Sequence, residues 1–427
     1  MNTQHTLLQK ALDFALGSPH SDFYRRKFGP SYKEYFDKPI QEIPFLVRTE
    51  IDAVPVFERT FVPRDMVRFI RSTSGSTGKS VIGFPMLEEG LYQNFLGLIG
   101  YQKESGQLSR YFEPYFSQMN IRSMLLFSAG SFVHEVRVRE MEGRQCIAGE
   151  FAQPKLTAEL AKEANIEAIV GNPSGLVDFA PHLKAIEGAD TVRLIISVGE
   201  RPTSLQFAAL QTIFPNAKIA LQYGLTESQG YVGYTCPEKL SIDPKALHVA
   251  DGTLFIELID PDTEVVLPLL PGTEGELVVT THEPQGFPLI RYRTGDFVRI
   301  RGESCACEGS PLLFECMGRL TLDRLRVPHG MLTIAAIEQA VSSLPGVQEF
   351  EAKWNAEGPL PRLEISLYMD SVKNGEGISI DELASRIRIA PKASYQTIVE
   401  EGRVLPLEVV TKPLEQWVGW KKKKRLH

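Results

Sequence analysis

The sequence lacks a long apolar run, and it lacks an excess of positive charge. No stretch approaches the ~18 uninterrupted apolar residues of a membrane-spanning helix, and residues 1–10 do not show the charged-then-apolar pattern of a signal peptide. The 53 Asp and Glu residues outnumber the 46 Lys and Arg residues, for a net charge of −7. Because polyphosphate backbones attract basic proteins, nucleic acid is not the expected partner. We expect a cytoplasmic protein without a membrane partner.

Cysteine is also scarce, with five residues in a chain of 427. An odd number spread over a long chain is a poor basis for a disulfide framework. Clustered cysteines in an intracellular chain indicate a metal before a disulfide, and thiolates with an imidazole suit tetrahedral Zn²⁺. Three of the five, Cys236, Cys305 and Cys307, are possible metal ligands, and the alternative is that they are unligated. Cys146 and Cys316 are expected to be ordinary buried thiols.

The chain is long enough for two or three domains, and 43% of its residues are hydrophobic. Between residues 156 and 222 helical and strand patterns alternate. The expected helices are 156–165, 174–186 and 203–214, and the expected strands are 168–171, 192–198 and 219–222. Such alternation predicts parallel βαβ units, hence an α/β fold with its ligand site at the carboxyl ends of the strands. Gly199-Glu200 and Tyr223-Gly224 fall at those ends.

The flanking segments have other patterns. Residues 7–50 read as short helices to which we assign no chemistry. Strands are expected at 66–71 and 81–85, and strands at 254–259, 275–280 and 297–301 predict a small antiparallel β subdomain. After residue 319 we expect a separate α+β domain, 320–427, with helices at 334–344 and 380–387 and strands at 349–354 and 362–369.

A polar loop between the first two strands combines glycines, hydroxyls and a lysine. Its residues are Thr73, Ser74, Gly75, Ser76, Thr77, Gly78 and Lys79. Free backbone N–H groups and one positive charge make it a candidate phosphate loop. It is not a Walker A loop, because only two residues separate Gly75 from Gly78 and a strand follows. Taken alone, the segment is explained better by an ordinary polar hairpin loop.

The loop is followed in order by three further motifs, each expected after a strand or at a hinge. These are Tyr223-Gly224-Leu225-Thr226-Glu227, Tyr292-Arg293-Thr294-Gly295-Asp296 and Gly318-Arg319. The ordered set resembles the adenylate-forming superfamily of acyl-CoA synthetases, adenylation domains and luciferases. The runs 23–28 and 288–296 are similar to the phenylacetate:CoA ligase branch. The resemblance covers nearly the whole chain.

The resemblance implies an N-terminal adenylation domain, 1–319, and a small mobile C-terminal domain, 320–427. It implies an ATP site in which residues 73–79 hold the β- and γ-phosphates and Gly199-Glu200 line the adenine. Tyr223 and Gly224 would lie against the purine, Thr226 would bond the α-phosphate, and Glu227 would bind Mg²⁺. Asp296 would accept the ribose hydroxyls, and Arg319 would reach the ribose or phosphate.

Two more sites follow from the resemblance. Members of the branch carry a Cys, a Leu-His pair and a Cys-x-Cys in corresponding places, which implies a Cys₃His structural zinc site formed by Cys236, His248, Cys305 and Cys307. A lysine near the C-terminus enters the active site during adenylation, and Lys421 and Lys422 are both candidates. The chain departs from the branch at the hinge, where one aspartate, Asp323, replaces a pair.

The leading hypothesis is an ATP- and Mg²⁺-dependent acid–thiol ligase that forms an acyl adenylate and passes the acyl group to CoA. A carrier-protein thiol or an amine would use the same first step. A nucleotide-binding homologue without ligation and, more weakly, a nucleic-acid protein using the lysine-rich tail are the alternatives. A homodimer is possible, as in many enzymes of this size.

Overall fold

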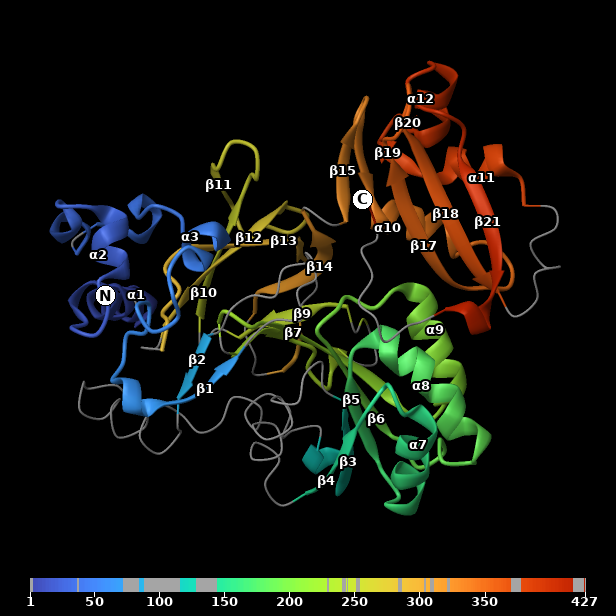
Figure 1. Ribbon diagram of the computed structural model, residues 1–427, viewed down its shortest axis with the longest axis horizontal. Coiled ribbons are helices and arrows are strands. Elements are labelled where there is room, and N and C mark those ends of the chain that lie inside the picture. The colour runs from blue at the N-terminus through green and yellow to red at the C-terminus, as the bar shows by residue number, and fades with distance from the viewer. Residues whose placement is uncertain are drawn as a thin grey trace. The chain divides into compact units, whose positions relative to one another are not determined.

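The computed structural model describes residues 3–36, 38–71, 84–87, 116–127, 144–228, 230–239, 243, 245–250, 254–282, 286–302, 305–307, 311–320, 323–369, 378–417 and 426. The candidate phosphate loop 73–79 and the tail residues Lys421 and Lys422 lie outside these ranges. The chain forms two compact units (Figure 1). The first comprises 1–121, 129–144 and 220–316, and the second comprises 122–128, 145–219 and 317–427.

The described helices, apart from short 3₁₀ turns, are α1 (Thr3–Gly17), α2 (Phe23–Phe28), α3 (Arg48–Asp52), α7 (Pro154–Glu163), α8 (Pro173–Ala185), α9 (Ser204–Ile213), α10 (Ile334–Val341), α11 (Ile380–Arg386) and α12 (Tyr395–Glu400). The described strands are β1 (Val67–Arg71), β2 (Phe84–Leu87), β3 (Ser123–Phe127), β4 (Gln145–Gly149), β5 (Ala168–Gly171), β6 (Leu194–Val198), β7 (Lys218–Leu225), β8 (Gly230–Tyr234), β9 (Leu247–Val249), β10 (Leu254–Ile259), β11 (Val266–Leu267), β12 (Glu274–Thr281), β13 (Tyr292–Arg301), β14 (Leu313–Arg319), β15 (Arg324–Val327), β16 (Gly330–Thr333), β17 (Val347–Asn355), β18 (Arg362–Met369), β19 (Arg388–Ala390), β20 (Ala393–Ser394) and β21 (Glu408–Pro413).

The first unit is built on strands in the order β11-β10-β12-β13-β14-β9-β8-β7, and its recorded pairings are antiparallel. Arg291, just before β13, links this sheet to the N-terminal segment. Its guanidinium donates twice to the buried carboxylate of Glu257 on β10, at 3.0 Å each. The same guanidinium donates to the carbonyl oxygens of Gln41 and Ile43. Buried ion pairs persist only when their remaining hydrogen-bonding groups are satisfied, as they are here.

The second unit contains a parallel sheet in the order β6-β5-β3-β4. Its helices α7, α8 and α9 lie along one face of these strands (Figure 1). The apolar periodicity of the helices and the nearly continuous apolar strands, Leu194–Val198 for example, bury a common core that includes Ile169, Phe179 and Leu210. Asn172 and Thr203 cap α8 and α9 with side-chain bonds to Gly175 and Gln206.

The rest of the second unit, residues 317–427, is α+β. Its three-stranded sheet runs β17-β18-β21, with β18 and β21 parallel, and the hairpins β15–β16 and β19–β20 stand beside it. Its core includes Leu332, Ile337, Phe350 and Leu367. On α10, Glu338 is 4% exposed and accepts bonds from Arg201 and from the amide of Ser204 at the start of α9, at 2.5 and 2.6 Å.

The α/β prediction is confirmed, and every helix and strand expected between 156 and 222 is present within a few residues. Two expectations about the motifs are wrong. Tyr223-Gly224 and the 292–296 motif do not follow strands but lie inside β7 and β13, because each strand continues to pair with its antiparallel neighbour. Cys146 and Cys316 are half-buried rather than buried. The predicted boundary at 319/320 stays a prediction.

A buried histidine in the first unit gives the stability a pH dependence. His282, just after β12, is 2% exposed, and neither ring nitrogen has a partner among the described residues. Burial lowers its pKa to about 4. Above pH ~6.5 the ring is neutral in both states; between ~6.5 and 4 only the unfolded chain takes up the proton. The free energy of unfolding should therefore decrease as the pH is lowered through this window, by on the order of 3 kcal/mol at pH 4.

Urea denaturation at pH 7 and pH 4.5 measures this loss. In His282→Leu the loss should shrink by on the order of 2 kcal/mol. An equal loss in the variant and the wild type would assign the acid sensitivity to other groups.

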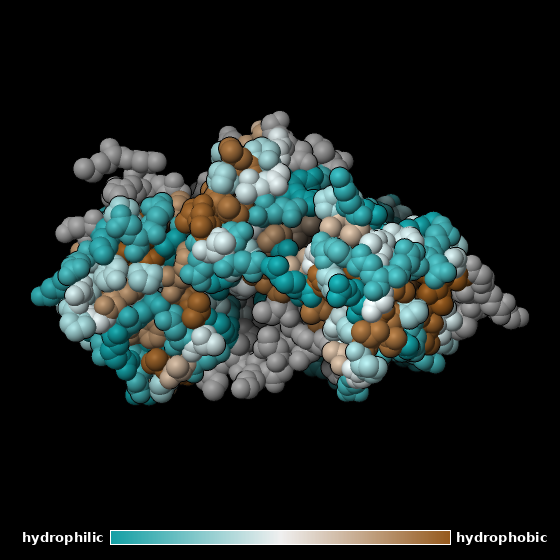
Figure 2. Space-filling model, turned by 90° about the horizontal axis from the view of Figure 1, so that it is seen from above, coloured by the Kyte–Doolittle hydropathy of each residue, from teal (hydrophilic) through white to brown (hydrophobic). Residues whose placement is uncertain are grey.

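The surface is mixed, with hydrophobic areas among hydrophilic ones on the face shown in Figure 2. The large apolar side chains that are exposed come from several elements, among them Leu156 on α7, Val266 on β11 and Val410 on β21. Scattered exposure of this kind is normal for folded chains. None of the helices in the described ranges combines the length and hydropathy that a bilayer span requires.

Candidate active site

Tyr223 and Asp296, which are 73 residues apart in the sequence, meet in the first unit. The Tyr223 hydroxyl donates to Oδ2 of Asp296 at 2.6 Å. The Tyr223 ring also meets Phe314 edge-on, with ring centroids 5.9 Å apart. Asp296 is 7% exposed, and Tyr223 and Gly224 are half-buried. The hydroxyl bond fixes the direction of the ring.

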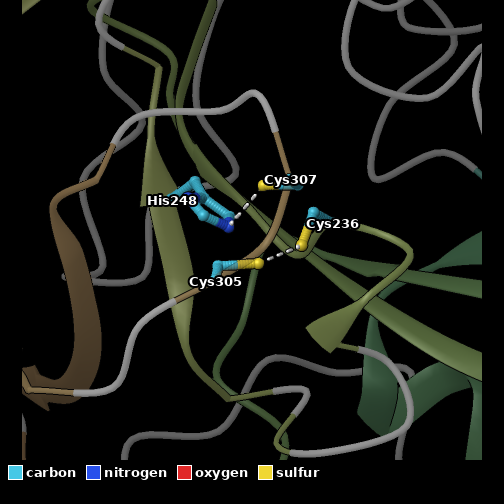
Figure 3. A group of neighbouring side chains, drawn as sticks. All are labelled: Cys236, His248, Cys305 and Cys307. Carbon is cyan, nitrogen blue, oxygen red and sulfur yellow. Dashed lines mark hydrogen bonds between the residues drawn. The ribbon is translucent and has the colours of Figure 1, made fainter.

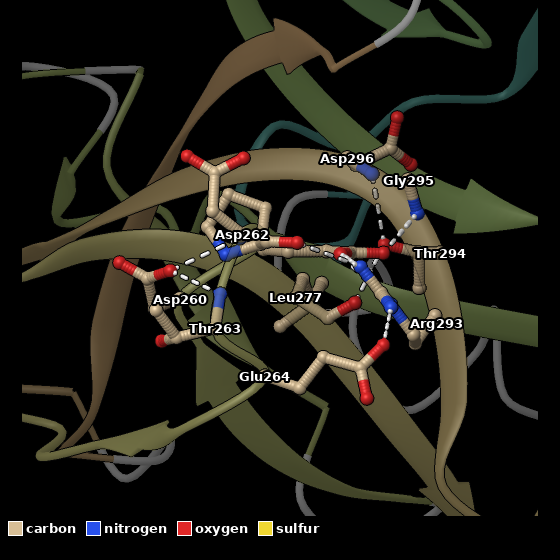
Figure 4. Close-up of polar contacts among 11 residues, drawn as sticks. Asp260, Asp262, Thr263, Glu264, Leu277, Arg293, Thr294, Gly295 and Asp296 are labelled. Atoms are coloured by element: carbon tan, nitrogen blue, oxygen red, sulfur yellow. Dashed lines mark hydrogen bonds and ion pairs between the residues drawn. The ribbon is translucent and has the colours of Figure 1, made fainter. Parts of the chain in front are cut away.

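A β-bulge presents Asp296. In the pairing of β12 with β13, Glu276 is opposite Phe297 while Val278 is opposite Arg293, so the register shifts across Thr294, Gly295 and Asp296. Gly295 has a φ of +71°, a left-handed conformation that glycine adopts without strain. The Thr294 hydroxyl donates to the Leu277 carbonyl at 2.8 Å and accepts from the Asp296 amide at 3.0 Å (Figure 4). The side chain of Thr294 thus replaces the ladder contacts that the bulge removes.

Glu276, on the neighbouring strand β12, stabilises this bulge. Its carboxylate is almost fully buried and accepts from the Gly295 amide at 3.2 Å and from the Arg293 guanidinium at 2.6 and 3.0 Å. Arg293 also bonds the exposed Glu264 at 2.5 Å (Figure 4). Glu276 therefore ties a backbone amide of the motif to a charged side chain of the same motif.

The resemblance implies that Asp296 binds the ribose hydroxyls of ATP, so loss of this support should weaken nucleotide binding. Glu276→Ala leaves the Gly295 amide without its acceptor, so Asp296 is misplaced, and the Kd for ATP should rise about tenfold or more. Isothermal titration with ATP measures the change. Glu264→Gln is the matched control, because it removes a second carboxylate from Arg293 without touching Gly295; an equal rise in both variants would contradict the role given to Glu276.

Glu227 lies two residues beyond β7, is 8% exposed, and is contacted by side chains from two other elements. The Tyr292 hydroxyl on β13 donates to Oε1 at 3.4 Å, and Arg48 at the start of α3 forms an ion pair with the same oxygen. Burial raises the pKa of Tyr292, so its hydroxyl stays protonated as a donor. Thr226 precedes Glu227 and is half-buried. A carboxylate beside a hydroxyl can complete a Mg²⁺ site whose other ligands are phosphates and water.

The remaining described candidates belong to the second unit. Gly199 has a φ of +87°, and a Cβ added there would meet nothing within 4 Å. Glu200 Oε2 accepts from the Ser174 hydroxyl at 2.8 Å, while Oε1 is buried without a partner among the described residues. The amide of Arg319 donates to Asp323 at 2.8 Å. Asp323, the aspartate expected at the hinge, therefore bonds the backbone of Arg319.

Cys236, His248, Cys305 and Cys307 converge in the first unit, as Figure 3 shows. Their ligand atoms all lie within 4.8 Å of one another. The sulfurs of Cys236 and Cys305 are 3.4 Å apart, and Cys307 Sγ lies 3.3 Å from His248 Nε2. Cys236 follows β8 and His248 lies on β9, whereas Cys305 and Cys307 lie between β13 and β14. Three segments of the sheet therefore meet at this cluster.

The cluster matches the requirements of zinc. Ligand atoms at tetrahedral Zn–S and Zn–N distances lie roughly 3.5–3.8 Å apart, close to the spacings found here. His248 and Cys236 are 1% and 2% exposed, which suits a closed structural site. Burial raises the pKa of Cys236. Burial also acts to raise that of Cys305, but hydrogen bonds from the Cys307 amide and the Cys236 thiol outweigh it and lower the pKa.

Two residues that contact Glu227, Tyr292 and Arg48, have no functional role that the sequence alone predicts. Tyr292 is part of a motif that was recognised, but only its Asp296 had an assigned function. Arg48 lies in the N-terminal segment to which no chemistry was assigned. Its contact with Glu227 spans 179 positions, and nothing in the local pattern of α3 marks it.

No family model matches the sequence. Among characterised proteins, a phenylacetate–coenzyme A ligase of Thermus thermophilus is 24% identical over 335 residues, which is 77% of this chain and 72% of that protein. The phenylacetate–coenzyme A ligase of Aromatoleum evansii is 24% identical over 294 residues, 64% of this chain and 62% of that protein. This chain is similar to both over most of its length.

Solved structures share the fold. A 2-hydroxyisobutyryl-CoA ligase in the postadenylation state, in complex with its acyl-AMP, matches with a TM-score of 0.74 at 16% identity, over 99% of this chain and 88% of that chain. An acyl acid amido synthetase, GH3.15, matches with a TM-score of 0.63 at 13% identity, over 99% and 92%. The chain therefore has the fold of these acyl-adenylate-forming enzymes, and its sequence is similar to those of the two phenylacetate–coenzyme A ligases.

Proposed function

We propose that this protein activates a carboxylic acid with ATP and transfers the acyl group to the thiol of CoA. The observation that carries the proposal is the meeting of Tyr223 with Asp296, which joins two nucleotide-binding motifs of the superfamily in one place. The similarity to phenylacetate–CoA ligases supports a thioester product and an aryl or alkyl acid. The amido synthetase has the same fold, so the acceptor has to be measured.

In the first step a carboxylate oxygen attacks the α-phosphorus of ATP, the bond to the β-phosphate breaks, and pyrophosphate leaves. In the second step the CoA thiolate attacks the acyl carbon and AMP leaves. Asp296 takes the ribose hydroxyls, Tyr223 the purine, and Thr226 the α-phosphate. Bound at Glu227, Mg²⁺ would neutralise phosphate charge and orient the leaving group. Catalysis here consists of positioning and charge stabilisation, and no side-chain nucleophile is needed.

Several residues enter this proposal through the resemblance. The loop 73–79 is assigned to the β- and γ-phosphates, Gly199 and Glu200 to the adenine, and Arg319 to the ribose or phosphate. Lys421 and Lys422 are the candidates for the lysine that meets the α-phosphate and the acid oxygen. A reducing compartment such as the cytoplasm suits both the reaction and its free thiols.

We also propose that Cys236, His248, Cys305 and Cys307 hold a structural Zn²⁺. All four donors are protein side chains whose ligand atoms lie within 4.8 Å of one another, so a tetrahedral ion bound by all four would have no open position for a substrate. The ion would tie the segment after β8 and the strand β9 to the segment between β13 and β14. It would thereby support the strand that carries Tyr292 and Asp296.

The test is isotope exchange between pyrophosphate and ATP over a panel of aryl and alkyl acids, with CoA consumption scored in parallel. Acid-dependent exchange with CoA consumption is expected. Exchange without CoA consumption, but with product formed from a carrier-protein thiol or an amine, would show that this compound and not CoA is the acyl acceptor. Tight AMP binding without exchange for any acid would overturn the proposed reaction in favour of a nucleotide-binding homologue.

A further inference from the structure

We propose that Arg48 is a positioning residue for Glu227 that holds its carboxylate in the metal-free protein and competes with the divalent cation for the same oxygen. The inference rests on the proposed function, in which Glu227 binds Mg²⁺. Arg48 comes from the N-terminal segment and precedes Glu227 by 179 positions in the sequence.

The competition follows from which atoms are in contact. The Arg48 Nη1 and the Tyr292 hydroxyl both donate to Oε1 of Glu227. The side chains of Arg48 and Glu227 are 26% and 10% exposed, so water screens this ion pair only partly. A divalent cation on Oε1 would stand within a few ångströms of the guanidinium, where like charges repel strongly at low local dielectric. Metal binding therefore requires the guanidinium to move away.

Arg48 has a second anchor that allows such a movement. Its Nε donates to both carboxylate oxygens of Asp52, each at 3.0 Å, one turn further along α3. Its Nη2 is buried and meets no acceptor among the described residues. A guanidinium held by Asp52, with one donor unmet, can release Glu227 and still remain paired. Asp52 thus serves as the resting partner of Arg48 when the cation takes the carboxylate.

The test measures metal binding directly. Mn²⁺ is titrated into the full chain without nucleotide, with one equivalent of Zn²⁺ present to fill the Cys/His cluster, and free Mn²⁺ is followed by electron paramagnetic resonance. Arg48→Met should lower the Kd for Mn²⁺ about fivefold or more, the size expected when a competing ion pair is removed. Arg48→Gln should do the same, and it replaces Arg48→Met if that variant does not fold.

Two controls make the result specific. The gain should vanish when Glu227→Gln is combined with Arg48→Met. Lys27→Met should leave the Kd unchanged, because it breaks the Lys27–Glu50 ion pair to the same helix, at 2.5 Å, without reaching Glu227. An unchanged or weaker Mn²⁺ affinity in both Arg48 variants, a gain that persists without Glu227, or an equal gain in Lys27→Met would overturn the proposal.

Exchange activity separates this proposal from the proposed function. The wild type could show no exchange with any acid while Arg48→Met still tightens Mn²⁺ binding through Glu227. That result would overturn the proposed reaction and support the competition between Arg48 and the cation. If the wild type exchanges normally and the Arg48 variants bind Mn²⁺ as the wild type does, the competition alone is wrong. In an active enzyme, Arg48→Met should also lower the Mg²⁺ concentration that gives half-maximal exchange, again about fivefold.

Discussion

Replacing Glu227 with glutamine is expected to slow acid-dependent pyrophosphate–ATP exchange about 100- to 1,000-fold. Glutamine has nearly the same shape and still accepts a bond from the Tyr292 hydroxyl, which lies 3.4 Å from Oε1. It lacks the negative charge that a magnesium ligand needs. The loss should appear mainly in kcat, because charge stabilisation at the phosphates is needed most when pyrophosphate leaves.

The control for this variant is Glu274→Gln, which neutralises an exposed carboxylate of the same unit that pairs with Arg299 at 2.5 Å. Exchange in that variant should stay close to that of the wild type. Thermal unfolding should show that Glu227→Gln is folded. Exchange within about tenfold of the wild type would show that the charge of Glu227 does not stabilise the reaction.

Loss of the metal from the Cys/His cluster is the second large effect that we expect. Cys236→Ser should lower the zinc content from one ion per chain to none and the free energy of unfolding by ~3–5 kcal/mol. For a unit of this size, that corresponds to a fall in Tm of roughly 6–20 °C. The cause is that three segments of the sheet lose the metal ion that they bind in common. Elemental analysis and thermal unfolding measure both quantities.

A matched control is available because the chain has cysteines outside the cluster. Cys316→Ser changes a half-buried thiol of β14 and should keep both the zinc and the Tm. Prolonged treatment of the wild type with a chelator should reproduce the unfolding behaviour of Cys236→Ser. A wild type that is purified without zinc and does not gain stability when zinc is added would contradict the structural role.

The sequence was most informative where one periodicity dominates. Between 156 and 222, helices such as Pro154–Glu163 and strands such as Leu194–Val198 follow the apolar pattern, because each packs one face or both faces on a single core. The convergence of Cys236, His248, Cys305 and Cys307 was also predictable, since the resemblance to the branch implies this set without any knowledge of the strand order.

Contacts between distant segments were not predictable in the same way. The pattern around Tyr292–Asp296 suggested that the strand begins only after the motif, because Thr, Gly and Asp are typical of turns. In the structure these residues belong to β13. The carboxylate of Glu276, on the neighbouring strand, accepts a hydrogen bond from the Gly295 amide and so compensates for the backbone bond that the bulge removes. Likewise, Arg48 reaches Glu227 only because the fold brings α3 beside β13, which no local pattern encodes.

The bulge at Gly295 also determines how the chain can change during evolution. In a regular strand, side chains alternate between the two faces, and a substitution leaves the direction of its neighbours intact. In β13 the direction of Asp296 depends instead on the number of residues opposite Leu277. Three residues, 294–296, lie opposite Leu277, so the loss of two would restore a regular ladder, and the loss of one would leave a smaller bulge and change the direction of the carboxylate. The length of this segment is therefore under stronger constraint than the identity of most of its side chains.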